Sequence, residues 1–230
     1  MCYQLHQKNR FSLFSTDEPR IGFILGTGPS LTQQQIEAIA PYRKFGANLT
    51  YRLGVDVALG CNWQFWDTYY SDAVKHGGML WTTRKESAEK YEKLNYIEER
   101  WEPGLSVDQN YVCAHHGSGP QVLNLAYHYG VRVFCLLGWD MRYPGKVTDR
   151  RYNGLRHYFG EYPKHLQHWP KTGDNGEFTG LIKEMETIRP KDYGIKIINC
   201  TEGSALKCFP MMSLSRFLSE YQNDLEWYTG

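Results

Sequence analysis

Short apolar runs alternate along this chain with longer segments in which apolar residues recur at helical spacing. The short runs predict buried strands, and the longer segments predict helices between them. Strands are predicted at residues 21–25, 45–50, 55–59, 79–83, 110–114, 131–137 and 195–199, and helices at residues 32–40, 63–75, 121–129, 178–188 and 213–221. This alternation predicts an α/β fold of the Rossmann-like kind, a mostly parallel sheet with helices on both faces.

Three segments do not follow the pattern. Residues 1–20 are polar and irregular and predict an N-terminal arm, whereas the charged residues 85–102 are most simply a solvated helix and loop. Residues 141–176 have little apolar periodicity but many Tyr, His, Arg and Gly residues, which predicts an aromatic-rich lid. We therefore expect an arm followed by a single nucleotide-binding domain over residues 21–230, with the lid at about 141–176.

The first predicted strand runs directly into the sequence Gly26-Thr27-Gly28-Pro29-Ser30-Leu31. A strand, a Gly-x-Gly turn and a helix together can aim backbone N–H groups at a phosphate. The third glycine of a nicotinamide fingerprint is replaced by Leu31, and residues 45–50 contain no acid for a ribose. These residues predict a nucleotide or phosphate cradle without NAD, and the alternative is an ordinary strand–turn–helix corner.

Polar residues also follow the other predicted strands. Because the carboxyl ends of parallel strands meet at one edge of a sheet, we expect these residues to converge on a ligand. Ser118-Gly119 opens a helix and forms a second candidate anion site, or a plain helix cap. Asn48 and Asn62 have amide groups that can bind a base or a ribose, or they form turns. The residues at strand ends are Thr27, Asn48, Asn62, Ser118, Asp140 and Asn199.

The candidate chemistry rests on one carboxylate and several histidines. Asp140 has no D-x-D partner, which disfavours a metal bridging a diphosphate, so no metal site is predicted. His168, beside Trp169 and Pro170 in the lid segment, is the best-placed general base, with simple surface exposure as the alternative. His115 and His116 are adjacent on a predicted strand end, so at most one of them faces the site.

Composition excludes several classes of protein. A net charge of +1 gives no electrostatic footprint for nucleic acid, and no apolar run is long enough to span a bilayer. The N-terminus lacks the apolar core of a signal peptide, and the six cysteines form no C-x-x-C pair, so reduced thiols and a cytoplasmic location are expected. The aromatic content of 15% suits stacking on sugars or bases as well as a core.

These motifs, taken in order, resemble those of bacterial lipooligosaccharide sialyltransferases. Residues 26–31 resemble that family's G-N-G-P-S-L motif, and Ser118-Gly119 with the block from Val133 to Asp140 resembles its S-G, helix and strand block. Residues 198–210 look like a second group with the same architecture, the archaeal 6-hydroxymethylpterin diphosphokinase-like family, which includes many phage proteins. Thr27 departs from the first motif, and Arg142 stands where the sialyltransferases have a tyrosine, with Tyr143 next.

The resemblance implies a transferase that uses a nucleotide-activated donor such as a CMP-sugar and needs no cofactor. It implies that Asn48 and Asn62 contact the nucleotide, and that His168 deprotonates an acceptor hydroxyl on a glycan or a modified base. Arg142, Tyr143 or Tyr152 would stabilise the departing phosphate.

The alternatives are a magnesium-dependent diphosphokinase and a catalytically idle nucleotide-binding protein. A homo-oligomer is possible, and a phage-encoded member would act in the host cytoplasm. The nucleotide-binding candidates are Gly26, Thr27, Gly28, Ser30, Asn48, Asn62, Ser118, Gly119 and Asp140.

Overall fold

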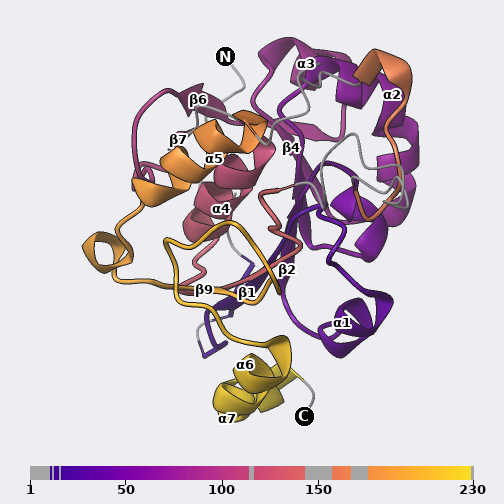
Figure 1. Cartoon of the computed structure of the whole chain (residues 1–230). Helices are drawn as coiled ribbons and strands as arrows, with labels where there is room; N and C mark the ends of the chain where they lie inside the picture. The colour runs from indigo at the N-terminus through magenta and orange to yellow at the C-terminus, as the bar shows by residue number, and fades with distance from the viewer. Residues whose placement is uncertain are drawn as a thin grey trace.

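A computed structural model describes residues 11, 13–15, 17–113, 117–142, 157–166 and 176–228. Seven parallel strands form one sheet in the order β5-β4-β3-β2-β1-β8-β9, which confirms the predicted α/β class (Figure 1). Sequential strands run outward from β1 to β5, and the chain then returns to add β8 and β9 on the other side of β1. The strands are β1 (Ile21–Leu25), β2 (Lys44–Ala47), β3 (Val57–Leu59), β4 (Met79–Thr82), β5 (Leu94–Tyr96), β8 (Val133–Leu137) and β9 (Lys196–Asn199).

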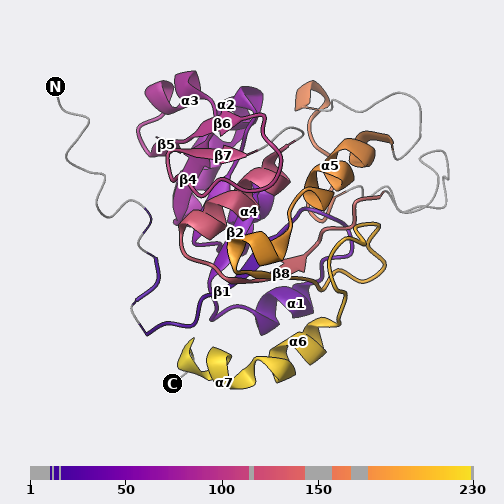
Figure 2. The same cartoon turned by 90° about the vertical axis from the view of Figure 1, so that its left-hand side faces the viewer.

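Helices cover both faces of the sheet, as predicted (Figures 1 and 2). Ile24 of β1 belongs to the core beneath α4 and α5, whereas its neighbours Phe23 and Leu25 belong to the core beneath α1, α2 and α6. This alternation follows from the period of two in a strand, and it makes both faces of β1 fully apolar. The helices are α1 (Gln33–Ala38), α2 (Trp63–Ala73), α3 (Lys85–Lys90), α4 (Ser118–His128), α5 (Gly176–Glu186), α6 (Leu214–Glu220) and α7 (Gln222–Leu225).

The charged segment 85–102 is more regular than the sequence suggests. After α3 it contributes β5 to the edge of the main sheet and then β6 (Glu98–Arg100), which pairs with β7 (Tyr111–Cys113) in a separate two-stranded sheet. The predicted solvated loop is therefore wrong, and the strand predicted at 110–114 lies outside the main sheet. Only Leu94 of β5 is fully buried, so this edge strand leaves no apolar run in the sequence.

The second predicted strand is shorter than expected. β2 ends at Ala47, and Asn48–Leu53 form a 3₁₀ helix. Asn48 has a φ of 54°, in the left-handed region, so the strand cannot continue through it. The sharp turn brings Asn48 to the carboxyl edge of the sheet, where its side chain can face a ligand.

The described parts of the arm and of the lid pack against the body of the protein. Phe11 stacks on Trp81 with ring centroids 5.4 Å apart. In the lid segment, Tyr158 donates its backbone N–H to the carbonyl of Thr27 over 2.8 Å, which holds residues 157–160 over the first loop. Among the described residues, no helix is long and apolar enough to cross a membrane.

Candidate functional site

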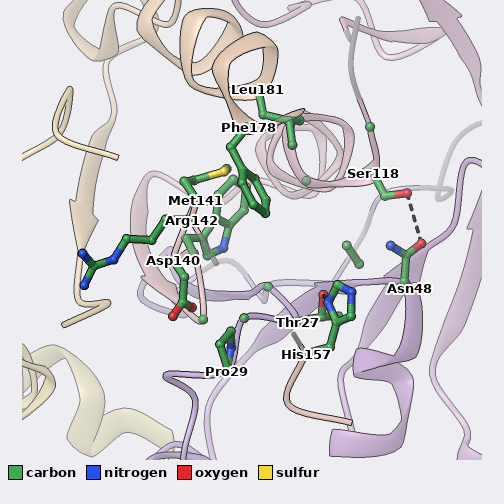
Figure 3. Close-up of a pocket in the computed structure, with 17 residues that line it drawn as sticks. Thr27, Pro29, Asn48, Ser118, Asp140, Met141, Arg142, His157, Phe178 and Leu181 are labelled. Carbon is green, nitrogen blue, oxygen red and sulfur yellow. Dashed lines mark hydrogen bonds between the residues drawn. The ribbon is translucent and has the colours of Figure 1, made fainter. Parts of the chain in front are cut away.

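A pocket of about 260 Å³ opens at the carboxyl ends of β1, β2 and β8. Its wall is built by the loops that follow these strands, by the first turn of α4, by one face of α5 and by His157 from the lid segment (Figure 3). The lining residues are Gly26, Thr27, Gly28, Pro29, Ala47, Asn48, Gly117, Ser118, Gly119, Gly138, Trp139, Asp140, Met141, Arg142, His157, Phe178 and Leu181.

Most of the nucleotide-binding candidates meet at this pocket. Ser30 does not line it but holds Asp140, and Asn62 lies outside it as the residue that precedes α2. Of the four catalytic candidates, Arg142 is in the described part of the chain, whereas His168, Tyr143 and Tyr152 lie outside the described residues, as do His115 and His116. The candidates that line the pocket are Gly26, Thr27, Gly28, Asn48, Ser118, Gly119, Asp140 and Arg142.

The first turn of α4 directs backbone donors into the pocket. Gly117 precedes the helix without a side-chain cap, and no acceptor among the described residues reaches the N–H groups of Ser118 and Gly119. Such uncapped N–H groups carry the positive end of the helix dipole and attract anions. The helix begins at Ser118, whereas the apolar pattern predicted only residues 121–129, so Ser118 and Gly119 belong to the helix and are not only its cap.

Asn48 adds a side-chain donor to the same end of the pocket. Its Oδ1 accepts from the Ser118 hydroxyl over 3.2 Å, so its Nδ2 is the group that faces His157 (Figure 3). No acceptor among the described residues reaches this Nδ2. The Ser118 Oγ also accepts from the backbone N–H of Cys61 over 3.1 Å, which fixes the position of both side chains.

Backbone strain is concentrated at the pocket. Asn48 and Met141 are the non-glycine residues with positive φ in the described chain, at 54° and 50°, and both line it. Asparagine tolerates this conformation, but methionine rarely adopts it. Strained residues of this kind cluster at ligand sites, because the surrounding structure holds the backbone where the ligand needs it.

The glycine-rich loop after β1 is not an open phosphate cradle. The N–H of Gly26 donates to the carbonyl of Leu137 over 2.8 Å, and that of Gly28 donates to Gly138 over 2.9 Å. A Cβ added at Gly28 would overlap both the Asp140 carboxylate and the Gly138 carbonyl oxygen. The expectation that these two amides bind phosphate is therefore corrected: the glycines allow the loops after β1 and β8 to pack closely.

Asp140 is also engaged by this loop. Its carboxylate accepts from the backbone N–H of Ser30 over 3.1 Å and from the Ser30 hydroxyl over 2.8 Å. Burial raises the pKa of Asp140 above 3.8, and these two hydrogen bonds oppose the shift. Ser30 and Asp140 thus connect the loop after β1 to the loop after β8, and their contribution to the pocket is to fix its shape.

His157 is the site residue that the sequence did not single out. Its Nδ1 lies 3.3 Å from the Thr27 hydroxyl, and its ring packs edge-on against Tyr162 with centroids 5.0 Å apart. No local sequence feature separates it from His165, which instead contacts Thr68 on α2 over 2.9 Å. Only the folding of the lid segment onto Thr27 places His157 at the pocket.

The opposite wall of the pocket is apolar. Trp139, Met141, Phe178 and Leu181 form it, and the indole N–H of Trp139 is satisfied by the carbonyl of Ile24 over 2.9 Å. Trp139 therefore presents only its apolar surface to the pocket. The pocket thus has one end rich in hydrogen-bond donors and one wall suited to a flat apolar group (Figure 3).

Asn199 has a structural role, the described contact of Asn62 is made by its backbone alone, and Arg142 faces away from the donors. Asn199 is fully buried, and its side chain bonds the carbonyl of Leu206 and the N–H of Thr201, each over 3.0 Å. The carbonyl of Asn62 accepts from the N–H of Trp66 in the first turn of α2. The guanidinium of Arg142 is exposed and points away from Asn48 and His157 (Figure 3).

Comparisons with protein-family models, with curated proteins and with solved structures find no match to this chain.

Proposed function

We propose that this protein is a transferase that binds a nucleotide-activated donor in the pocket above β1, β2 and β8. The observation that carries the proposal is the pairing of an anion-attracting end with an apolar wall in one pocket. The backbone N–H groups of Ser118 and Gly119 and the Nδ2 of Asn48 are all donors without acceptors in the described chain. A nucleotide has the complementary parts, an anionic phosphate and a flat base.

In this arrangement the phosphate lies at the N-terminus of α4, where the helix dipole and the free N–H groups stabilise its charge. The base or the activated group lies against Trp139, Phe178 and Leu181, with its apolar face removed from water. The same donors stabilise the negative charge that remains on the phosphate when the donor bond breaks, a role that requires no proton transfer to the leaving group.

His157 is the histidine of the described chain that lines this pocket, and we assign it the role of accepting a proton from the attacking hydroxyl. The acceptor oxygen forms a bond to the donor carbon, the bond to the phosphate oxygen breaks with its electron pair, and the hydroxyl proton passes to the imidazole. Thr27, whose hydroxyl lies 3.3 Å from Nδ1, orients the ring. Support for His157 is its position in the lining of the pocket, whereas support for His168 comes from the sequence, from its neighbours Trp169 and Pro170 and from the resemblance.

A thermal-shift titration with CMP, UDP, GDP and ATP, each with and without magnesium, tests the binding step. A ligand at a hundred times its Kd stabilises the folded protein by about 2.7 kcal/mol. The decisive variant is Asn48→Asp, which keeps the acceptor for Ser118 but replaces the Nδ2 donor with a charged oxygen. We expect it to weaken nucleotide binding by about a hundredfold or more, because a charged group left unpaired or repelled costs about 3 kcal/mol.

Asn62→Asp is the matched control, since Asn62 also follows a strand and precedes a helix but lies outside the pocket. It is expected to bind nucleotide as the wild type does. Equal losses in the two variants, or binding unchanged in Asn48→Asp, would remove the site from this pocket.

Hydrolysis of a CMP-sugar, with water in place of the acceptor hydroxyl and followed as release of CMP, tests the chemistry. His157→Ala is expected to lose about a hundred- to ten-thousandfold in rate with nucleotide affinity retained. His168→Ala tests the residue indicated by the resemblance, and a larger loss there would transfer the role of base to it. Activity that disappears with EDTA and returns with magnesium would favour diphosphoryl transfer, and binding without turnover of any donor would indicate an idle nucleotide-binding protein.

A further inference from the structure

A second groove lies beside the pocket on the same edge of the sheet. It has a volume of about 320 Å³ and runs between the start of α2 and α3, which follow β3 and β4. Its lining is one aromatic ring, one small hydroxyl residue and four charged side chains, none of which contributes to the pocket described above. The lining residues are Trp63, Asp67, Arg84, Glu86, Ser87 and Lys90.

Trp63 is the aromatic residue of this groove, and it is 54% exposed. It is the first residue of α2, and the two aromatic residues that follow on the helix, Phe65 and Trp66, are buried in the core. The indole of Trp63 is thus held by a rigid helix start but directed out of the core. An exposed indole face of this kind can pack against the C–H groups of a sugar ring.

The charges of the groove balance one another. Lys90 donates to Asp67 over 2.8 Å, and Arg84 donates to the carbonyl of Cys61 over 2.8 Å while one of its terminal nitrogens lies 3.4 Å from Glu99. Hydrogen bonds from Lys90 and Tyr91 lower the pKa of Asp67, so this carboxylate remains an acceptor at neutral pH. A groove that holds carboxylates and cations in equal number has no net field to attract an anion, but it offers donors and acceptors to a ligand with many hydroxyl groups.

The groove and the pocket share a structural element. Cys61, which follows β3, gives its carbonyl to Arg84 in the groove and its N–H to Ser118 in the pocket. The two sites therefore lie side by side on the carboxyl edge of neighbouring strands. A transferase needs its acceptor next to its donor, and this arrangement provides that proximity.

We propose that the groove around Trp63 binds a neutral carbohydrate, with the sugar ring on the indole and its hydroxyls on Asp67, Arg84 and Glu86. Its role as the acceptor site rests on the proposed function, but the binding itself does not.

Saturation-transfer NMR and tryptophan fluorescence with lactose, cellobiose and maltose test this binding. The wild type is expected to bind at least one of these sugars in the millimolar range, and Trp63→Ala is expected to weaken that binding by about tenfold, because the stacking surface is lost. Trp101→Ala is the matched control, since Trp101 is 69% exposed and lies outside the groove. Trp63→Phe retains a flat ring and is expected to restore part of the affinity.

Sugar binding that is absent from the wild type, or reduced equally in Trp63→Ala and Trp101→Ala, would overturn the proposal. Cytidine or uridine binding that depends on Trp63 and competes with the sugar would also overturn it, because the groove would then be a base site. Nucleotide affinity is measured on the same variants and should not change in Trp63→Ala. Sugar binding without any nucleotide binding would leave the groove as proposed and reject the donor pocket.

Discussion

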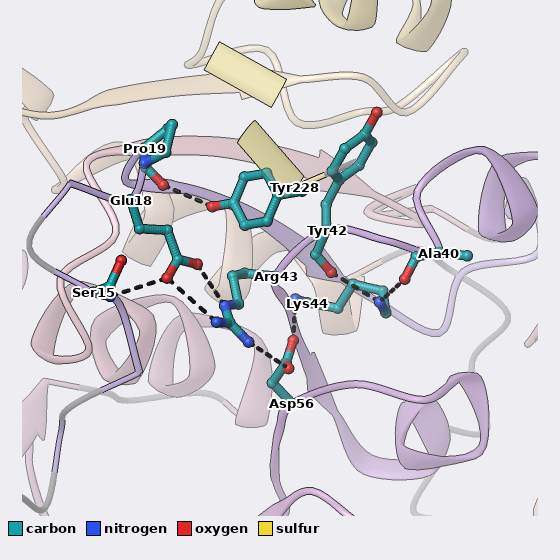
Figure 4. Close-up of polar contacts among 9 residues, drawn as sticks. All are labelled: Ser15, Glu18, Pro19, Ala40, Tyr42, Arg43, Lys44, Asp56 and Tyr228. Carbon is teal, nitrogen blue, oxygen red and sulfur yellow. Dashed lines mark hydrogen bonds and ion pairs between the residues drawn. The ribbon is translucent and has the colours of Figure 1, made fainter. Parts of the chain in front are cut away.

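Polar groups at the amino ends of the central strands have partners within the described part of the fold, whereas several donors at the carboxyl ends do not. We call these two sides of the sheet the amino edge and the carboxyl edge. At the amino edge, Glu18 has a side chain only 1% exposed and accepts from Arg43 Nε over 2.6 Å and from the backbone N–H of Ser15 over 3.0 Å (Figure 4). Arg43 also reaches Asp56 over 3.5 Å, and Asp56 accepts from the backbone N–H of Lys44 over 2.7 Å. Each buried charge here has partners within the fold.

The ammonium group of Lys44 completes this amino-edge network. It donates to the carbonyls of Ala40 and Tyr42 over 2.7 and 2.8 Å, and burial lowers its pKa. Tyr228, close to the C-terminus, donates to the carbonyl of Pro19 over 2.7 Å, so the network also joins segments from the two ends of the chain (Figure 4).

At the carboxyl edge, by contrast, the N–H groups of Ser118 and Gly119 and the Nδ2 of Asn48 have no acceptor in the described chain. The backbone there also adopts two strained conformations, at Asn48 and Met141. Satisfied polar groups stabilise a fold, and unsatisfied donors on a rigid support are available to a ligand. The amino edge is therefore expected to control stability, and the carboxyl edge to control binding.

The largest effect on stability is expected from Arg43→Ala at the amino edge. It leaves the buried Glu18 carboxylate without its cation, which should lower the free energy of unfolding by about 3 kcal/mol. Urea denaturation measures the loss, and nucleotide affinity of the folded variant should not change. Arg216→Ala removes an exposed ion pair of 3.8 Å on α6 and is expected to cost less than about 0.5 kcal/mol. Equal losses in the two variants would contradict the assignment.

A more moderate effect on stability is expected from Gly28→Ala. Gly28 lies at the carboxyl edge, but its N–H group is satisfied within the fold by the carbonyl of Gly138. Because the added Cβ would overlap Asp140 and Gly138, the two loops must separate, at a cost of about 1–3 kcal/mol. Nucleotide binding should weaken at the same time, since the pocket changes shape. A variant of normal stability that has lost only binding would instead restore the phosphate cradle expected from the sequence.

Tyr228→Phe should have a smaller effect on stability. It deletes the hydroxyl that joins the C-terminal segment to Pro19 and is expected to lower the free energy of unfolding by about 1 kcal/mol. Tyr158→Phe is its control at the carboxyl edge, where the lost hydrogen bond to Gln33 is exposed and 3.2 Å long. If Tyr158→Phe costs as much as Tyr228→Phe, the described part of the lid is as tightly bound as the chain ends.

The sequence was sufficient for the class of fold because the central strands of the main sheet are apolar on both faces. β1 and β8 are almost completely buried, and such runs stand out from the sequence. β5 and β6 are not apolar runs, because they lie at an edge and in a small second sheet. Edge strands depend on their neighbours for pairing, so their own residues give little signal.

The sequence indicated some of the residues that line the pocket and not others. The rule that ligands bind at the carboxyl edge was enough to bring Thr27, Asn48, Ser118 and Asp140 together in one pocket, since it depends only on topology. It could not show that the N–H groups of Gly26 and Gly28 bond to the end of β8 and to the loop after it, which lie more than a hundred residues away. His157 was missed for the same reason, because a contact across 130 residues leaves no trace in local sequence.

The smallest effect is expected from Asp140→Asn, and its sign follows from the direction of the pKa shift. Burial raises the pKa of Asp140 in the folded protein above the 3.8 of the unfolded chain. At pH values between 3.8 and the folded-state pKa, the folded protein therefore binds more protons than the unfolded chain. The free energy of unfolding contributed by this group is therefore highest below pH 3.8 and falls as the pH rises through the folded pKa. Asparagine keeps an oxygen for the N–H of Ser30 and does not titrate, so the difference in stability between variant and wild type should shift in favour of the variant as the pH rises through this window.

Urea denaturation at a series of pH values measures that difference, and Ser30→Ala is the control that removes the opposing hydroxyl bond and raises the pKa of Asp140 further. A difference that is independent of pH would show that the Asp140 carboxylate is solvated in the pocket, and Asp140 would then be available to the ligand instead of serving only to hold the loop.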